Sequence, residues 1–460
     1  MNINSLGKKN IKYYSTNRRS PEVSFSEALL TGLAPDGGLY LPDSFPAIEK
    51  EELESFSERE YNEIAFSVLE KLIGNEIGSR ELMQICNDAY DFEVPLGKVE
   101  DRKYIMRLDN GPTASFKDFA ARMMSRLMQY FLASGNRHLT ILTATSGDTG
   151  SAVASAFYGL PNIDVIILFP KDEVSDMQRK QMSTLKENIK VIAVDGKFDD
   201  CQRLVKQAFM DPSLSHLSLS SANSINIGRL LPQSVYYFYA WAKLSGKINE
   251  HVVFSVPSGN FGNLMGGIVA SKMGLPVEHF VISTNENDEV PEFFRTGRYK
   301  VLSPSRNCIS SAMNVGHPSN LARIIDLFGG MMNEMGIITM EPDMDKMHDI
   351  LYSVSISDND TIKTIEEVYN KSGILLEPHG AVAWRGLNEY LRLYSLNHSQ
   401  APLSVSLETA HPAKFPDELR RIIKTDPVLP ASLMGLEGKP EHFITLENKY
   451  ELLKNFILNF

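Results

Sequence analysis

A lysine stands where a predicted helix begins, and its position suits nucleophilic chemistry. Lys117 is followed by apolar residues at the spacing of one helix face, namely Ala120, Met123, Met124, Leu127, Met128 and Phe131. The dipole of a helix amino end and an apolar surrounding both lower the pKa of a lysine. A neutral amine of this kind can form a Schiff base with a carbonyl compound. The alternative, and the commoner case for a lysine taken alone, is an exposed side chain at a frayed helix end.

A glycine-containing loop further along the chain could hold a phosphate group. The segment V-P-S-G-N-F-G-N (256–263) joins a predicted strand to an apolar helix. Gly259 and Gly262 let the backbone approach a ligand, and the helix behind them offers N–H groups and a positive dipole. The segment is neither a Walker loop nor G-x-G-x-x-G. A plain strand-to-helix turn is the alternative.

The segment T-A-T-S-G-D-T-G (143–150) has the same placement between a strand and a helix. Ser146, Thr149 and the backbone N–H groups could hold a carboxylate or a phosphate. Asp148 would repel such an anion unless it caps the backbone or binds an amine. The alternative is a capped helix start with Asp148 or Thr149 as the N-cap.

A third loop, L-E-T-A-H-P-A-K-F-P (407–416), places Thr409 at the end of a predicted strand. His411 could be catalytic, although a single histidine before proline is more often structural. Together with Lys117, these loops match the needs of pyridoxal phosphate. This cofactor requires a lysine amine, a phosphate site and a partner for its ring nitrogen, beside an anion site for the substrate carboxylate.

Alternating strands and helices must position these loops. The predicted strands are 138–143, 164–169, 190–194, 251–256 and 278–283, and helices between them are predicted at 151–158, 173–186 and 199–209. Continuous β-branched runs that alternate with helices indicate an α/β fold whose parallel strands are buried on both faces, with right-handed crossovers. Ligands bind at the carboxyl ends of such strands, where these loops lie.

Three other segments have a distinct character. Residues 1–95 are predicted to form a separate unit, with tight bends at 34–42 and a helical stretch at 49–72. Residues 287–320 contain several turn residues and are predicted to be a mobile loop region. Residues 428–460 are predicted to be a helical tail.

Composition excludes several classes of function. The 460 residues carry a net charge of −11, which argues against a broad nucleic-acid surface. No apolar run is long enough for a membrane span. The three cysteines are far apart and suit a reducing cytoplasm, and neither they nor the histidines have the spacing of a metal site. The basic opening segment lacks the apolar run of a secretory signal, so we expect it to be part of the mature protein.

Several motifs, in one order along nearly the whole chain, resemble those of the threonine synthase family. This family belongs to the tryptophan synthase β-subunit-like, or fold type II, pyridoxal-phosphate enzymes. The motifs are Y-Y-S-T-N (13–17), S-F-S-E-A-L-L-T-G-L-A-P-D-G-G-L-Y-L-P (24–42), G-P-T-A-S-F-K-D-F-A (111–120), T-A-T-S-G-D-T-G-S-A (143–152), P-S-G-N-F-G-N (257–263), G-H-P-S-N-L-A-R (316–323), E-P-H-G-A-V-A (377–383) and T-A-H-P-A-K-F (409–415).

The resemblance implies two open, mostly parallel α/β domains with the cofactor between them, plus an amino-terminal domain specific to the family. We place the amino-terminal domain at 1–95. The smaller α/β domain, with the Schiff-base lysine and the S-G-D-T-G loop, is placed at 96–225. The larger domain, with the cofactor-phosphate loop and the ring-nitrogen partner, is placed at 226–460.

The resemblance also implies roles for individual residues. Lys117 is similar to the lysine that forms the Schiff base, and Thr409 to the hydroxyl facing the ring nitrogen; a neutral hydroxyl there implies a largely unprotonated nitrogen. The cofactor phosphate is expected at Gly259, Asn260, Phe261, Gly262 and Asn263. The amino-acid end of the substrate is expected at Ser146, Gly147, Asp148 and Thr149. Candidates for the substrate phosphate are Asn314, Ser319, Asn320 and Arg323.

The activity implied by the resemblance is conversion of O-phospho-L-homoserine and water to L-threonine and phosphate, the last step of threonine biosynthesis. Alternatives on the same scaffold are a serine or threonine dehydratase and a phospho-lyase acting on a phosphorylated amine. A non-catalytic binding protein that keeps the fold is an alternative of another class. We expect a cytoplasmic monomer or homodimer without an effector domain, a metal, a nucleic-acid partner or a membrane partner.

Overall fold

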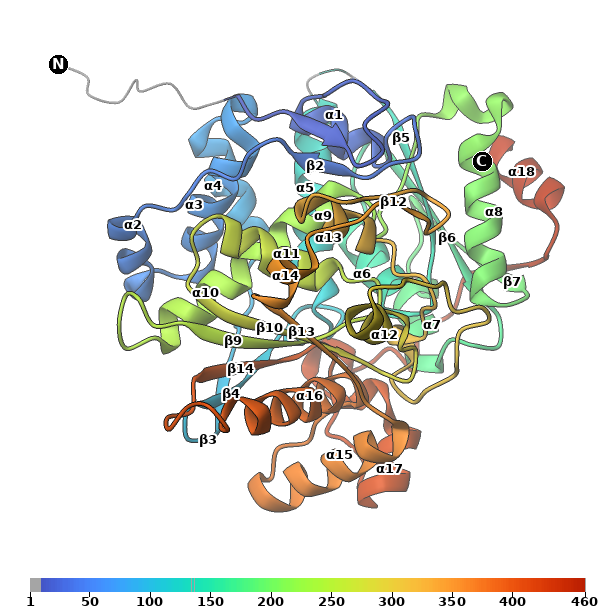
Figure 1. The fold of residues 1–460 in the computed structure, drawn as a ribbon. Helices are drawn as coiled ribbons and strands as arrows, with labels where there is room; N and C mark the ends of the chain where they lie inside the picture. Colours follow the sequence, from blue (N-terminus) through green and yellow to red (C-terminus); the bar gives the residue numbers. More distant parts are fainter. Residues whose placement is uncertain (1–9, 134, 136, 460) are drawn as a thin grey trace.

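A computed structural model describes residues 10–133, 135 and 137–459, so the predicted nature of residues 1–9 lies outside the described part of the chain. Two sheets dominate the architecture (Figure 1). The larger has six strands in the order β13-β10-β9-β14-β4-β3, and only β3 runs antiparallel to its neighbour. Its strands are β3 (Leu96–Glu100), β4 (Lys103–Arg107), β9 (Val252–Pro257), β10 (Val277–Thr284), β13 (Leu351–Ser355) and β14 (Leu403–Glu408).

The smaller sheet has five parallel strands in the order β15-β7-β6-β5-β8. Its strands are β5 (Leu139–Ala144), β6 (Ile163–Pro170), β7 (Ile189–Asp195), β8 (Leu219–Ser220) and β15 (Ile444–Glu447). The central strands are almost wholly buried, because β-branched and other apolar residues fill both faces. The predicted parallel α/β class is therefore confirmed, and the five predicted strands each lie within one or two residues of an observed strand.

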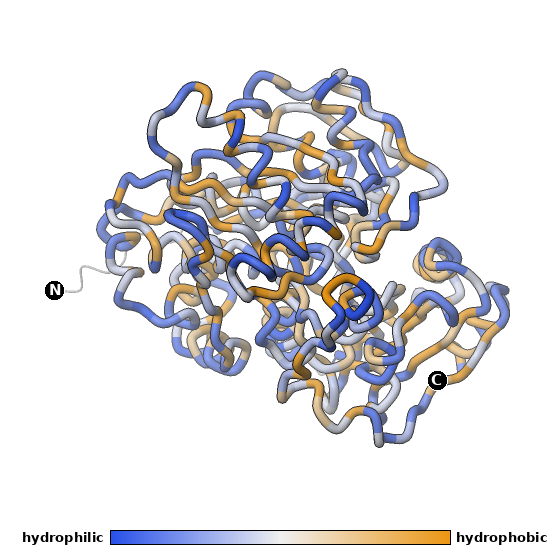
Figure 2. The backbone as a smooth tube through the Cα atoms, turned by 90° about the horizontal axis from the view of Figure 1, so that it is seen from below, coloured by the Kyte–Doolittle hydropathy of each residue, from blue (hydrophilic) through white to orange (hydrophobic). Residues whose placement is uncertain are grey.

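Helices cover both faces of each sheet. Under the larger sheet lie α15 (Asp358–Ser372), α16 (Pro378–Tyr394) and α17 (Pro416–Ile423), and above it lie α10 (Val235–Leu244) and α11 (Gly262–Lys272) (Figure 1). The smaller sheet packs on one face against α8 (Phe198–Met210) and α18 (Tyr450–Leu458). Its other face meets α5 (Lys117–Ala133), α6 (Asp148–Phe157) and α7 (Asp176–Ser183). In Figure 2 the hydrophobic segments, in orange, lie largely in the interior, and hydrophilic segments follow much of the outer edge.

The amino-terminal unit packs on this body rather than standing apart from it. It contains β1 (Tyr13–Ser15), β2 (Tyr40–Pro42), α1 (Phe25–Thr31), α2 (Lys50–Ser55), α3 (Tyr61–Ile73) and α4 (Ser79–Ala89). The ring of Tyr61 lies 5.3 Å from that of Phe119 on α5 and 5.3 Å from that of Tyr239 on α10. The helix predicted at 49–72 is interrupted, because Glu60 and Glu63 form a capping box that starts α3 afresh.

The remaining α-helices and strands are short. They are α9 (Ile227–Leu230), α12 (Glu289–Thr296), α13 (Leu321–Leu327), α14 (Met344–His348), β11 (Met331–Met332) and β12 (Ile338–Met340). Helix α12 lies inside the region predicted as loop at 287–320. Within the described residues, no helix is both long enough and apolar enough to cross a membrane.

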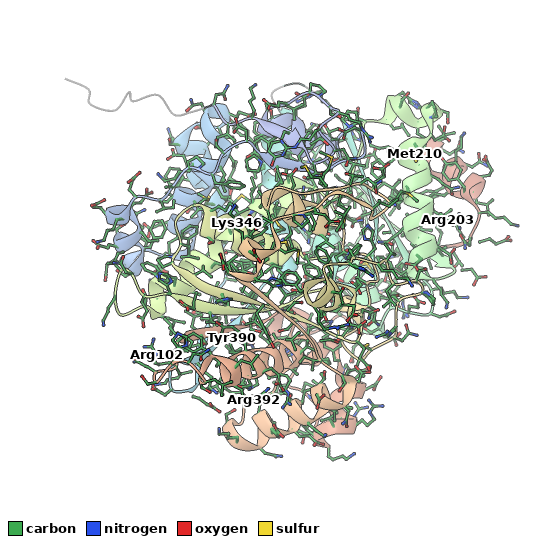
Figure 3. The ribbon with its side chains drawn as sticks, viewed as in Figure 1. Arg102, Arg203, Met210, Lys346, Tyr390 and Arg392 are labelled. Atoms are coloured by element: carbon green, nitrogen blue, oxygen red, sulfur yellow. The ribbon has the colours of Figure 1, made fainter. Side chains whose placement is uncertain are left out.

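The two sheets divide the chain differently from the predicted domain boundaries. Strands β3 and β4 pair with β14, so residues 96–107 belong to the larger sheet. The tail at 428–460 contains a strand as well as a helix, since β15 pairs with β7 and returns the chain to the smaller sheet. Arg203 on α8 donates to Asn448 beside this strand, and Figure 3 shows Arg203 next to α18. Strand pairing depends on register across distant segments, which no local pattern at 95 or 225 marks.

All four loops singled out in the sequence follow the carboxyl ends of strands. β4 ends at Arg107, β5 at Ala144, β9 at Pro257 and β14 at Glu408. Three of these strands are adjacent in the larger sheet, in the order β9-β14-β4. The fold therefore supplies the expected edge for a ligand site.

Candidate active site

Lys117 is the first residue of α5, as predicted. The preceding loop is closed by Asp118, whose carboxylate accepts hydrogen bonds from Thr113 N at 2.8 Å and Thr113 Oγ1 at 2.7 Å. Ala114 has a φ of +54°, a left-handed conformation that is uncommon for a residue with a side chain. Tertiary contacts hold this loop, since Phe116 N donates to the Thr409 carbonyl at 2.8 Å. The loop thus fixes the direction in which Lys117 leaves the helix end.

The amine of Lys117 is mostly buried and lies among several charged side chains. Its side chain is 15% exposed, and Nζ lies 3.9 Å from Asp148 Oδ2 and 4.7 Å from the centre of the Phe116 ring. Burial lowers its pKa to about 8; the Asp148 carboxylate opposes this change, and the cations of Lys414 and Arg229 reinforce it. At neutral to mildly basic pH an appreciable fraction of this amine is therefore unprotonated.

Asp148 links the S-G-D-T-G loop to a second lysine. Its Oδ1 accepts from Lys414 Nζ at 2.6 Å and from Gln178 Nε2 at 2.9 Å. Burial alone would raise the pKa of Asp148, but the cations of Lys414 and Lys117 outweigh it and hold the pKa well below its usual range. Asp148 thus forms an ionic cluster with two lysine amines. Of the two roles predicted for it, capping the backbone or binding an amine, the structure shows the second.

The backbone of the S-G-D-T-G loop is fixed by hydrogen bonds to the side chain of Thr145, which precedes it. Thr145 Oγ1 accepts from Gly147 N at 2.9 Å and from Gly150 N at 2.8 Å. Gly147 has a φ of +134°, and a Cβ there would meet the Gln178 side chain at 2.4 Å, so this position requires glycine. Gly147 is also the N-cap of α6, without a side-chain cap, which contradicts the alternative in which Asp148 or Thr149 is the N-cap. Ser146 is exposed, and Thr149 is partly buried.

Two buried cations beside Lys117 were missed by sequence reasoning. Lys414 is 1% exposed and also donates to the Thr113 carbonyl at 2.9 Å. Arg229 is 4% exposed and donates to the Ala222 carbonyl at 2.7 Å. Lys414 stands in the quoted T-A-H-P-A-K-F motif, whose lysine could have been noticed. Arg229 lies in the short helix α9, for which the sequence offers no comparable signal.

Thr409 lies beside the Lys117 loop at the end of β14. Ser115 and Ala410 form an antiparallel bridge, which sets the two loops against each other. Thr409 is 5% exposed, and its Oγ1 lies 3.2 Å from Glu377 Oε1. His411 accepts from Ala413 N through Nδ1 at 3.1 Å and caps the turn that follows, which agrees with the structural alternative for this histidine.

The loop at 256–263 leads into α11, which begins at Gly262. Phe261 is buried with a φ of +62°, a strained conformation for an aromatic residue, and such strain concentrates at ligand sites. A Cβ at Gly259 would lie 2.8 Å from the Ala312 carbonyl oxygen. The Asn263 side chain donates to the Pro257 carbonyl at 2.8 Å and so steadies the loop. Leu264 N donates to Asn263 Oδ1 at 3.0 Å, and the N–H groups of Gly262 and Asn263, which precede it in the first turn of α11, are placed to receive an anion.

The structure brings the four substrate-phosphate candidates near this loop, in different ways. Ser319 Oγ lies 3.3 Å from Asn260 Oδ1, and Asn320 Nδ2 donates to the Asn260 carbonyl at 2.9 Å. Arg323 is fully buried and donates to the carbonyls of Tyr40, Ser224 and Ile225 and to Asn320 Oδ1. The side chain of Asn314 bonds to Asn285 and Cys308. The Ser319 hydroxyl has only long contacts, at 3.3 Å with Asn260 Oδ1 and 3.4 Å with Ser224 Oγ, so of the four side chains it is the most readily available to a ligand.

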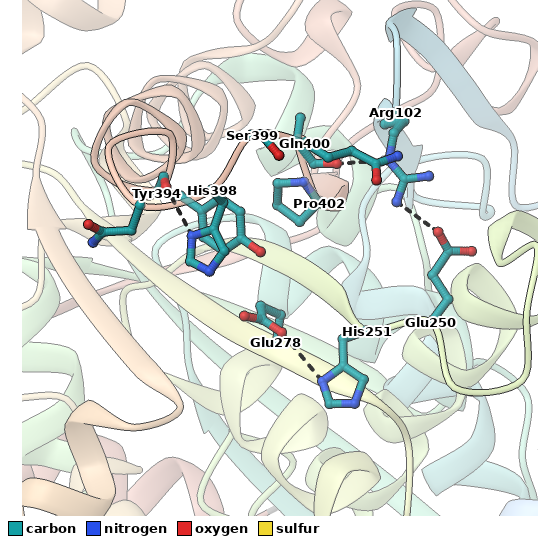
Figure 4. Close-up of a pocket in the computed structure, with 11 residues that line it drawn as sticks. Arg102, Glu250, His251, Glu278, Tyr394, His398, Ser399, Gln400 and Pro402 are labelled. Carbon is teal, nitrogen blue, oxygen red and sulfur yellow. Dashed lines mark hydrogen bonds and ion pairs between the residues drawn. The ribbon is translucent and has the colours of Figure 1, made fainter.

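A separate surface pocket lies at the other end of the larger sheet. It has a volume of about 430 Å³ and is lined by residues at the amino ends of β4, β9, β10 and β14, including Arg102, Glu250 and His251 (Figure 4). Arg102 Nη2 lies 2.7 Å from Glu250 Oε1, and His251 Nδ1 lies 3.4 Å from Glu278 Oε2. These charges are paired with each other, and the pocket is at the amino ends of the strands, opposite Lys117.

Comparisons with known proteins agree with this geometry. A family model for "Pyridoxal-phosphate dependent enzyme" matches residues 95–400, and models for "Threonine synthase N terminus" and "Threonine synthase, C-terminal" match 12–90 and 386–457. Threonine synthase of Buchnera aphidicola (from Acyrthosiphon pisum) is 38% identical over 452 residues, 97% of this chain and 100% of that protein. That of Escherichia coli K12 is 37% identical over 453 residues, 98% of this chain and 100% of that protein.

The chain belongs to the threonine synthase family. A crystal structure of pyridoxal-phosphate-bound threonine synthase from Brucella melitensis superimposes with a TM-score of 0.89 at 36% identity, covering 98% of this chain and 99% of that one. Membership makes this chain a pyridoxal-phosphate-dependent lyase and confirms the expected fold type.

The residues at the strand ends fit this cofactor. The site offers a buried amine with a pKa near 8, a loop in which a Cβ at Gly259 would have no room, and a helix amino end for a phosphate. Thr409 adds a buried hydroxyl next to the Lys117 loop. These groups are of the kinds that pyridoxal phosphate requires, and they follow the ends of three adjacent strands, β4, β9 and β14.

Proposed function

We propose that this enzyme converts O-phospho-L-homoserine and water to L-threonine and phosphate. The observation that carries the proposal is Lys117, a buried amine with a pKa of about 8 in the ionic cluster of Asp148 and Lys414, within a chain that matches threonine synthases along nearly its whole length. An amine with such a pKa can accept and return protons near neutral pH.

Pyridoxal phosphate supplies an aldehyde for an amine and a conjugated ring that takes up the electron pair left on a substrate carbon. Lys117 Nζ provides that amine and, once released by the substrate amine, removes the α proton. After passing that proton on, the same amine would be the simplest base for the second deprotonation at Cβ. The γ-phosphate would then leave with the electron pair of its C–O bond, and protonation at Cγ and addition of water at Cβ would give threonine. Lys117 lies at the start of a helix whose preceding loop is fixed by Asp118 and Thr113. We infer that this position lets its single amine reach protons on both Cα and Cβ of the substrate.

The proposed contacts of the cofactor follow from the strand ends. Gly259, Asn260, Phe261, Gly262 and Asn263 are assigned to its phosphate through the backbone N–H groups at the start of α11. Thr409 is assigned to its ring nitrogen. Close packing of Gly259 against Ala312 and the contact between Phe116 N and the Thr409 carbonyl support these two assignments.

The substrate is assigned to two loops. Ser146, Gly147, Asp148 and Thr149 are proposed to receive its amino-acid end, with Asp148 holding cationic groups rather than the carboxylate. For its phosphate we retain Asn314 and Ser319 as candidate ligands. Asn320 and Arg323 are proposed to act by holding the 316–323 loop, because their donors are already engaged by backbone carbonyls.

Lys117→Ala tests the central assignment. The variant should fold, lose the absorbance that a lysine-bound cofactor produces, and lose turnover of O-phospho-L-homoserine. Lys171→Ala, at an exposed lysine after β6, is the matched control and should behave as wild type. Normal turnover by Lys117→Ala would refute the role of this amine.

Product identification separates the proposed reaction from its alternatives. Threonine and phosphate in equal amounts are expected from O-phospho-L-homoserine. Phosphate without threonine would support a phospho-lyase. Ammonia and a keto acid from serine or threonine would support a dehydratase, and no turnover with bound cofactor would support a non-catalytic role.

We further propose a cytoplasmic location and a monomeric or homodimeric state. All three cysteines are free and buried, which is compatible with a reducing compartment. Sedimentation equilibrium of the holoenzyme tests the oligomeric state, and fractionation of cells that express the chain tests the location.

A further inference from the structure

Two motifs of the amino-terminal unit have no part in the roles proposed above. They are Y-Y-S-T-N (13–17) and D-G-G-L-Y (36–40). The Asp36 carboxylate joins them by accepting three hydrogen bonds of 2.6 to 2.9 Å, from Ser15 Oγ, Arg19 N and Gly38 N. A Cβ at Gly38 would lie 2.1 Å from Ser15 Oγ, so this close approach requires glycine. The two motifs therefore form one compact unit around Asp36.

Helix α13 docks against this unit through two charged residues that lie three positions apart, on one face of the helix. Arg323 Nε donates to the Tyr40 carbonyl at 3.0 Å, and Asp326 Oδ1 accepts from the Tyr14 hydroxyl at 2.6 Å. Figure 1 shows β2, which begins at Tyr40, close to α13. One face of α13 thus presents a cation and an anion to the amino-terminal unit.

The Asp326 carboxylate depends on the amino-terminal unit for its partners. Arg18 Nη2 lies 3.0 Å from Oδ1 and 2.9 Å from Oδ2, and its guanidinium stacks 3.7 Å from the centre of the Tyr14 ring. Within the described residues, Tyr14 and Arg18 are the only hydrogen-bond donors to this carboxylate. The Asp326 side chain is 2% exposed, and burial raises its pKa against the opposing effects of these two residues. Without them a buried carboxylate would be left unpaired, which is costly.

The other end of α13 carries the loop that meets the cofactor-phosphate segment. Asn320 is the N-cap of α13, and its Nδ2 donates to the Asn260 carbonyl at 2.9 Å. Ser319 Oγ lies 3.3 Å from Asn260 Oδ1. Helix α13 has seven residues and is therefore about 10 Å long. Because a helix this short moves as one body, displacement of Asp326 would also displace Ser319 and Asn320.

We propose that Tyr14 and Arg18 are positioning residues for the phosphate of the substrate, on which they act through α13. By fixing Asp326 they hold this helix, and with it Ser319, in place beside the cofactor-phosphate segment. The inference rests on the proposed function, in which Ser319 is a ligand of the substrate phosphate. The amino-terminal unit thus adapts the site to a phosphorylated amino acid, whereas the cofactor has its own phosphate loop at 259–263.

Arg18→Met tests this role because it leaves the buried carboxylate of Asp326 without its cation. The KM for O-phospho-L-homoserine and the inhibition constant of inorganic phosphate should each rise by about 10-fold or more, since small displacements of positioning groups have effects of this size. The affinity for pyridoxal phosphate, from equilibrium dialysis, should be unchanged. The affinity for L-threonine, from the absorbance of the bound cofactor, should also be unchanged, because threonine has no phosphate. Arg80→Met, at an exposed arginine on α4, is the matched control.

The comparison of ligands with and without phosphate separates positioning from a general structural role. An equal loss of affinity for L-threonine and for the phosphorylated substrate in Arg18→Met would overturn the proposal, and so would unchanged constants for both. Wild-type enzyme that does not turn over O-phospho-L-homoserine would refute the proposed function and this inference with it. That failure is distinguishable, because it appears without any variant.

A double variant, Arg18→Met with Asp326→Asn, keeps the test decisive if the single variant is unstable. Asparagine at position 326 has no charge to pair and can still accept from the Tyr14 hydroxyl. Removing one partner of a buried ionic contact is costly, whereas replacing both by neutral groups can be nearly neutral, so the KM should return to within about threefold of wild type. A double variant that unfolds in urea like wild type but keeps the raised KM would contradict the link through Asp326.

Discussion

Replacing Lys414 by methionine tests whether a neighbouring cation keeps Lys117 neutral. The two amines share Asp148, with Lys414 Nζ at 2.6 Å from Oδ1 and Lys117 Nζ at 3.9 Å from Oδ2. Across one carboxylate the amines are roughly 7 Å apart, and two unit charges at this separation repel by about 2 kcal/mol at an effective dielectric constant of about 20. Lys414→Met removes this repulsion and leaves Asp148 to Lys117 alone.

Both changes favour the charged form of Lys117, so its pKa should rise from about 8 to between about 9 and 10. At pH 7.5 the neutral fraction of the amine should then fall by about 8-fold if the pKa becomes 9 and by about 75-fold if it becomes 10. Because only the neutral amine attacks an aldehyde, the rate at which apoenzyme captures pyridoxal phosphate should fall by the same factor.

The assay is the rate of cofactor capture by apoenzyme between pH 6.5 and pH 10.5, followed by absorbance. The variant and wild-type rates should converge at high pH, where both amines are neutral, and this convergence shows that the site has kept its shape. Lys424→Met, at an exposed lysine after α17, is the matched control. A variant profile with an unchanged or lower midpoint would refute the electrostatic reasoning.

Two more predictions concern the loops around the cofactor. Gly259→Ala should weaken pyridoxal-phosphate binding by about 10- to 100-fold in equilibrium dialysis, because the added Cβ would lie 2.8 Å from the Ala312 carbonyl oxygen, whereas Gly438→Ala, with no atom within 4 Å of its Cβ, should bind as wild type. Arg323→Met should lower the free energy of unfolding in urea by at least about 3 kcal/mol, because it leaves buried carbonyls, including that of Tyr40, without their donor. If stability were unchanged and the KM for the phosphorylated substrate were raised, Arg323 would instead be assigned as a ligand of the substrate phosphate.

The strand-end loops could be predicted from sequence because each has a local signal. Lys117 precedes a regular apolar stripe, and Gly259 and Gly262 stand between a strand and a helix. The structure confirms α5 from its first residue and the strands before each loop. Periodicity and turn chemistry act over a few residues, so they are visible in a single chain.

The ionic and polar partners could not be predicted in the same way. Lys414 reaches Asp148 from 266 positions away in the numbering, and Glu377 reaches Thr409 from the start of a different helix. Such contacts depend on the register of strands and on which helix ends meet, and these follow from packing of the whole sheet. The same cause explains why β3, β4 and β15 lie in other sheets than the predicted domain boundaries assign.

The position of β15 has a consequence for synthesis of the chain. Strand β7 is made early, but its outer edge pairs with β15 only after residues 196–443 have been added. Until then a nascent chain carries the sheet behind the S-G-D-T-G loop with one edge unpaired, and unpaired strand edges are templates for association with other chains. The ion pair of Lys454 with Asp211 at 2.9 Å and the bond from Tyr450 to Asp211 at 2.7 Å then fasten this late segment. Premature release of the chain before residue 444 would therefore leave a lobe that contains Asp148 but has a permanently open, aggregation-prone edge.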